Sequence, residues 1–162
     1  MFPSTSGMTM DAPSEAHALI STLGQALGEA SLQMDDEGLA FLPLSNEFFL
    51  HLQADPQRQC FIAFAVVGTL PLQPPVRMLK RLLQANRFWR ETAGATLSLD
   101  SEQPPRLVLA DRYDWPGLDA DDFTDRVNQF IDILHEARAW LEDPVESDAS
   151  GWQPAPLGHS LA

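Results

Sequence analysis

The stretch TLPLQPPVRMLKRLLQANRFWRETAGATLSLD, residues 69–100, decides how this chain folds. The double proline at Pro74 and Pro75 marks the start of a helix, because proline is tolerated in the first turn of a helix and not deeper. We expect this helix over residues 76–89. Residues 96–99, TLSL, then alternate between polar and apolar side chains, as a strand does.

The apolar arc of the 76–89 helix is wider than one sheet can cover. At about 100° per residue, its apolar residues span roughly half of the circumference, whereas a one-sided surface helix needs a stripe of about 100°. A second copy of the protein is the simplest cover for the remainder, so the sequence predicts a homodimer. The interface candidates are Met78, Leu82 and Trp89.

Upstream of this helix, the apolar period changes from that of a helix to that of a strand. A stripe of leucine and isoleucine predicts a first helix over residues 14–28. Strand-like segments follow at residues 31–35, 39–44, 48–53 and 60–67. The connections between them have the length of hairpin turns, which favours an antiparallel sheet.

Downstream, Leu107 and Leu109 alternate as in a strand that returns beside the 96–99 strand. Asp119 is expected to cap a final helix that has an apolar stripe. The sequence therefore predicts an α+β fold, an antiparallel sheet with three helices in the order α-β-β-β-β-α-β-β-α. We expect one domain over residues 13–142, a flexible leader at 1–12 and a disordered acidic, proline-rich tail at 143–162.

Composition narrows the function classes. The 162 residues carry a formal net charge of −13, which disfavours binding to nucleic acid or to an anionic membrane surface. No run approaches the ~18 apolar residues of a membrane span. The first residues lack the charged and apolar regions of a signal peptide. We therefore expect no membrane insertion and a cytoplasmic protein.

The sequence offers no catalytic constellation. His135 and Glu136 begin like a zinc-protease motif, but Ala139 stands where the second histidine must be. Helix capping explains the acidic residues of 119–125 better than calcium binding does. Cys60 lies in an apolar strand, which makes its thiol inert. We predict no catalytic residue, no metal ligand and no cofactor.

Basic residues concentrate on the 76–89 helix and just after it. They fit a solvated helix face that balances an acidic protein better than they fit the alternative, a salt-bridge patch for a partner or a second subunit. The members are Arg77, Lys80, Arg81, Arg87 and Arg90.

Several motifs together resemble one protein family. GTLP at 68–71, LLQAN at 82–86 and TAGATLSLD at 92–100 resemble the class I chaperones of bacterial type III secretion, the Tir chaperone (CesT-like) family. Ala93 stands where that family has the first glycine of the turn. The resemblance covers about residues 14–141.

The resemblance implies a compact α/β homodimer that acts without ATP. Such chaperones hold the N-terminal region of a secreted effector in an extended, non-globular form that stays competent for secretion. Apolar residues of the first helix and the early strands could form the groove for that segment. The groove candidates are Leu23, Leu27, Leu32, Leu42 and Phe48.

Two other functions remain open at this point. The same scaffold could belong to a regulatory protein that binds another chaperone or a transcription regulator. A small enzyme or ligand-binding α+β domain is the third hypothesis, and it would need a convergent polar pocket.

Overall fold

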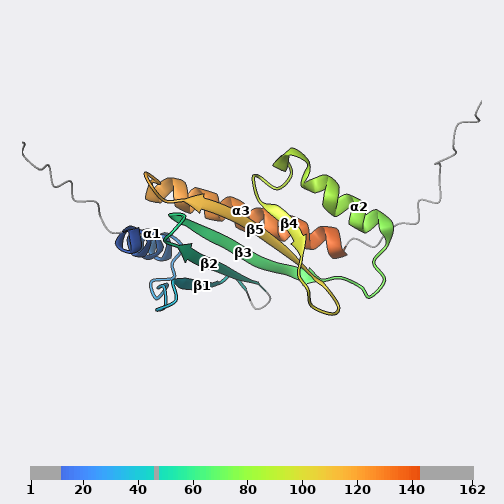
Figure 1. Ribbon diagram of the computed structural model, residues 1–162, viewed down its shortest axis with the longest axis horizontal. Helices are drawn as coiled ribbons and strands as arrows, with labels where there is room; N and C mark the ends of the chain where they lie inside the picture. Colours follow the sequence, from blue (N-terminus) through green and yellow to red (C-terminus); the bar gives the residue numbers. More distant parts are fainter. Residues whose placement is uncertain (1–11, 46–47, 143–162) are drawn as a thin grey trace, which may run out of the picture.

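The computed structural model describes residues 12–45 and 48–142 (Figure 1). The predicted tail, and the predicted leader apart from Ala12, lie outside these residues. The elements are α1 (Ala12–Ala26), β1 (Leu39–Pro43), β2 (Phe49–Asp55), β3 (Cys60–Thr69), α2 (Val76–Ala85), the 3-10 helix η1 (Arg87–Trp89), β4 (Thr96–Leu99), β5 (Arg106–Asp114) and α3 (Ala120–Glu142).

The five strands form one antiparallel sheet in the order β1-β2-β3-β5-β4. Hairpins join β1 to β2, β2 to β3 and β4 to β5. The α2 segment carries the chain from β3 past β5, so that β4 becomes one edge strand and β1 the other. The structure thus confirms the predicted α+β class with an antiparallel sheet and three α-helices.

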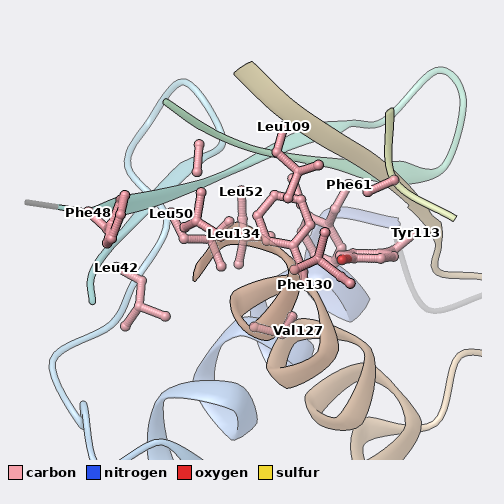
Figure 2. Packing of buried hydrophobic residues seen from close by; sticks show 14 of the residues in the cluster. Leu42, Phe48, Leu50, Leu52, Phe61, Leu109, Tyr113, Val127, Phe130 and Leu134 are labelled. Carbon is pink, nitrogen blue, oxygen red and sulfur yellow. The ribbon is translucent and has the colours of Figure 1, made fainter. Parts of the chain in front are cut away.

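The core lies between one face of the sheet and the helices α1 and α3 (Figures 1 and 2). Alternate strand residues point into it, which the strand period of two requires. Phe61 of β3 stacks on Phe123 of α3, and Trp115 meets the edge of the Phe61 ring. Along α3 the buried stripe is Phe123, Val127, Phe130, Ile133, Leu134 and Ala137.

The helix predicted over 76–89 ends earlier, at Ala85. The side-chain amide of Asn86 donates to the carbonyl oxygen of Leu97 at 2.9 Å and accepts from the backbone N–H of Leu97 at 2.8 Å. Phe88 and Trp89 then have φ values of 56° and 53°, in the left-handed region that no α-helix can continue through. The same two bonds satisfy the backbone N–H and C=O of Leu97, which point away from the sheet at its edge strand β4.

The strand predicted at 31–35 is reduced to a single bridge between Met34 and Ala40. The Asp35 carboxylate accepts the backbone N–H groups of Glu37 and Leu39, each at 2.9 Å, and so bends the chain into a tight turn. That turn leaves the segment too short to form a further strand.

Candidate functional site

The predicted groove residues lie inside the molecule. Leu23 is fully buried, Leu42 is 2% exposed, and Leu32 and Phe48 are each 6% exposed. Leu27 is partly buried against the same cluster. Leu23 belongs to the stripe that α1 buries, and Leu42 points to the helix-covered face of the sheet. These positions are therefore core in the single chain, where a partner cannot contact them without rearrangement, and their role in binding stays a prediction.

The predicted interface residues are divided between core and surface. Met78 and Leu82 are buried at 8% and 6% exposure, whereas Trp89 is 55% exposed. The apolar arc of α2 is nevertheless wider than the part of it that the rest of the chain buries, as expected. Val76 and Leu83 remain 67% and 72% exposed on the same helix.

A row of aromatic side chains crosses the face of the sheet opposite to α1 and α3. Phe41 of β1 stacks on Phe49 of β2 with ring centroids 4.9 Å apart. The His51 ring meets Phe41 edge-on at 5.1 Å and stacks on Phe64 of β3 at 4.7 Å. Desolvation in this row holds the pKa of His51 below its usual range. We call these four residues the aromatic row.

The outer face carries further apolar side chains, together with the polar Gln53 and the charged Arg112. Phe41 and Phe49 are 48% and 39% exposed, and the apolar side chains beyond them are half-buried. None of the helices α1 to α3 packs on this face. The further outer-face residues are Ile62, Val66, Val108 and Ala110. The period of two in the sequence separates this outer face from the inner face, to which the groove candidate Leu42 belongs.

A second apolar feature lies between α2 and the edge strand β4. A groove of about 230 Å³ runs there beside the exposed Leu83. Leu72 and Phe88 are 84% and 71% exposed at the two ends of the α2 segment, and Leu99 of β4 is 47% exposed. We call this surface the α2 patch. The groove is lined by Leu79, Leu82, Leu83, Asn86, Leu97, Ser98, Leu99 and Leu107.

The candidates for chemistry in the sequence stay apart in the described residues. Cys60 is buried, and desolvation raises the pKa of its thiol, which keeps it protonated. Within residues 12–45 and 48–142, no three His, Cys, Asp or Glu side chains come close enough together to hold a metal ion. In the same ranges, no helix is long and apolar enough to cross a membrane.

These features agree with the comparison against known families. The Tir chaperone protein (CesT) family model matches residues 18–138, so the chain belongs to this family of type III secretion chaperones. The family is one of chaperones, not of enzymes. A protein of Chlamydia pneumoniae is 26% identical over 126 residues, which cover 77% of this chain and 92% of that protein.

Solved structures share the fold. The ExsC–ExsE complex contains a chain that matches with a TM-score of 0.70 at 20% identity, covering 82% of this chain and 97% of that one. The HopA1–SchA chaperone–effector complex contains another, with a TM-score of 0.63 at 17% identity, covering 78% and 95%. At these identities the likeness is one of fold.

Proposed function

We propose that this protein is a type III secretion chaperone that binds the N-terminal region of a secreted effector in extended form and keeps it competent for secretion. It acts in the bacterial cytoplasm and performs no chemistry on its partner. The observation that carries this proposal is the aromatic row on a sheet face that α1 to α3 leave uncovered. Family membership and the chaperone–effector complex of a structural neighbour support it.

An extended segment suits the aromatic row because every second residue of such a segment points the same way. Apolar residues at alternate positions would lie over Phe41, Phe49 and Phe64 while the intervening residues face water. Ordering a flexible segment requires considerable apolar burial, on the order of 1,000–3,000 Å². The outer face continues past the row over β3 and β5, which extends the apolar surface available to the segment.

Strand addition can contribute only a little at the β1 edge. The backbone N–H of Asp35 donates to the carbonyl of Leu39 at 2.9 Å, and Met34 bridges Ala40, so the start of β1 is already paired on its outer side. By strand alternation, the next outward residues are Phe41 and Pro43, and Pro43 has no N–H to donate. Side-chain burial on the aromatic row must therefore supply most of the affinity.

We also propose that the α2 patch pairs two copies of the chain. Large apolar side chains that are this exposed and this close together mark an interaction site. A second α2 patch is a self-complementary cover, as a two-fold dimer requires. The ion pair between Arg81 and Glu91, at 2.7 Å, reduces the repulsion between two basic helices.

The test uses the N-terminal ~100 residues of each effector of the native secretion system. Calorimetry and limited proteolysis should show protection of an extended segment and a negative heat-capacity change. Phe41→Ser combined with Phe49→Ser should weaken binding by about 30-fold or more, as loss of a hot spot does. Asn128→Ser combined with Gln129→Ser is the control, because both residues are exposed on α3, away from the aromatic row and from the α2 patch.

Two outcomes contradict the proposal. If no effector segment binds, but another chaperone or a transcription regulator is captured through the same face, the protein is a regulator on this scaffold. If effectors bind equally well to the double variant, the aromatic row is not the binding surface.

A further inference from the structure

One side of α2 carries three basic residues. Arg77, Lys80 and Arg81 share this side, because residues three and four positions apart are neighbours on a helix. Leu79 and Leu82, which line the groove of the α2 patch, lie roughly on the opposite side of the helix. We call the three basic residues the basic flank.

The charge of the basic flank is only partly balanced. Arg81 pairs with Glu91 at 2.7 Å, and its guanidinium also lies over the Trp140 ring, 4.4 Å from the ring centroid. Lys80 is exposed and makes no hydrogen bond or ion pair with any described residue. The first turn of α2 contains no acidic residue. The flank therefore keeps a positive charge that an anionic partner can neutralise.

The last turn of α3 lies beside this flank (Figure 1). Trp140, which contacts Arg81, stands two residues before α3 ends at Glu142. That last turn contains no basic residue, and residues 143–148, DPVESD, add three acidic residues directly after it. Acidic residues are unfavourable at the negative end of a helix dipole. Cations from another element can offset this, and the basic flank is the element that α3 brings there.

The stretch 143–148 can reach the whole flank. Six residues span at most about 20 Å, whereas Arg77 and Arg81 are about 6 Å apart along the helix axis. No Lys or Arg occurs in residues 143–162, so no like charge in that segment opposes the attraction. A second copy of the flank is excluded as the cover, because two basic flanks repel each other. The net charge of −13 repels large polyanions such as nucleic acid.

We propose that residues 143–148 dock along the basic flank of α2 in the same chain, with their three acidic side chains next to the three basic ones. The inference concerns the chain by itself and does not depend on the chaperone function. The sequence predicts no fold for residues 143–162 on their own, and the pairing of exposed charges along a helix requires none. Docking leaves the α2 patch open on the other side of the helix, so it is compatible with self-association there.

The test measures how close residue 147 comes to α2 in the full chain. A nitroxide label is attached to the variant Ser147→Cys, and Cys60 does not compete for it, because Cys60 is buried and its thiol stays protonated. The backbone amide signals of Lys80 and Gln84 are followed by NMR at low ionic strength and in about 1 M NaCl, where the Debye length falls to about 3 Å. We expect paramagnetic broadening of both signals at low salt and its loss at high salt. Broadening that salt leaves unchanged would reflect the tether alone and overturn the proposal.

A matched pair of charge variants identifies the acidic residues. Asp143→Asn with Glu146→Gln and Asp148→Asn should lower the ratio of docked to free segment by about 3-fold or more, as expected for the loss of three exposed ion pairs. The control variant removes the same formal charge from exposed positions on α3 through Asp125→Asn, Asp132→Asn and Glu136→Gln. It should leave the broadening nearly unchanged. Equal losses in the two variants would reduce the effect to net charge and contradict a specific site.

Lys80 identifies the basic side of the contact. Lys80→Glu should reduce the broadening at Gln84, whereas Lys80→Arg keeps the charge and should preserve it. The position is exposed, so both variants should fold. Equal broadening in the two variants would show that the segment does not face this flank.

A dilution series identifies the chain that supplies the segment. Docking within one chain gives the same broadening at every protein concentration, since the two partners are covalently linked. Broadening that disappears on dilution would place the segment on a second copy and overturn docking within one chain.

Discussion

The two faces of the sheet carry similarly apolar side chains but differ in what covers them. On the inner face, Phe61, Leu52 and Leu109 are fully buried under the helices (Figure 2). On the outer face, Phe41 and Phe49 of the aromatic row are 48% and 39% exposed. The inner face stabilises the fold through burial. The outer face retains the unfavourable contact with water that a partner can relieve.

The largest expected effect is the difference in the free energy of unfolding between two single variants, one that truncates a phenylalanine on the inner face and one that truncates a phenylalanine on the outer face. Phe61→Ala removes a ring that contacts Trp115 and Phe123 at 5.0 and 5.3 Å, and it should lower the free energy of unfolding by about 3–5 kcal/mol. Phe41→Ala should lower it by less than about 1 kcal/mol, because water already reaches that ring. Urea denaturation measures both. Equal losses would mean that the outer face is covered in solution.

The α2 patch allows the same comparison on neighbouring residues. Leu83→Asp should give a folded protein whose self-association is weaker by at least about 2 kcal/mol, or roughly 30-fold, since Leu83 is 72% exposed. Leu82→Asp should instead unfold the chain, because it buries an unpaired charge at a position that is 6% exposed. Light scattering and circular dichroism separate the two outcomes. A wild-type monomer at micromolar concentration would refute the dimer.

The sequence predicted which residues share a face but not which face is covered. Alternation separates Leu50 and Leu52 from Phe49 and His51 correctly, yet it is silent on where α1 and α3 pack. The groove candidates are among the most apolar positions of the sequence. The same apolar character places Leu23 and the other well-buried candidates in the core.

Other features depend on contacts between distant residues. The end of α2 depends on hydrogen bonds from Asn86 to Leu97, 11 positions away. A pocket beside the start of β1 is lined by His17, by the turn before β1 and by Trp115, which no local pattern brings together. Periodicity within a single segment contains no information on such contacts.

Asn86 satisfies the backbone N–H and C=O of Leu97 at the β4 edge of the sheet, beside the α2 patch. Asn86→Ala removes both hydrogen bonds to the backbone of Leu97 and leaves a part-buried N–H and C=O without partners. We expect the free energy of unfolding to fall by about 1–3 kcal/mol. Amide hydrogen exchange at Leu97 should accelerate more than exchange in β2. Asn86→Asp is the informative companion, because it keeps the acceptor for the N–H of Leu97 and loses the donor.

The smallest expected effect concerns a charge on the covered face. Asp111 pairs in register with the buried Ala63, and it lies two residues from the buried Leu109 and Tyr113. Desolvation raises the pKa of Asp111 above its ordinary value, although Arg126 and the backbone N–H of Arg112 act in the opposite direction. Because folding favours the protonated form, the ionised carboxylate destabilises the fold at neutral pH, and this penalty disappears as the pH falls below the pKa.

Asp111→Asn should therefore stabilise the protein near pH 7. If the gain reaches about 1 kcal/mol, the Tm rises by roughly 2–4 °C. The advantage over wild type should shrink as the pH is lowered, because wild-type Asp111 then becomes protonated itself. Asp132→Asn, at an exposed position on α3, is the control and should show no such convergence with pH. A variant that is less stable than wild type at pH 7 would show that the attraction to Arg126 and the hydrogen bond from the backbone N–H of Arg112 outweigh the desolvation of Asp111. A charge would then be tolerated on the covered face.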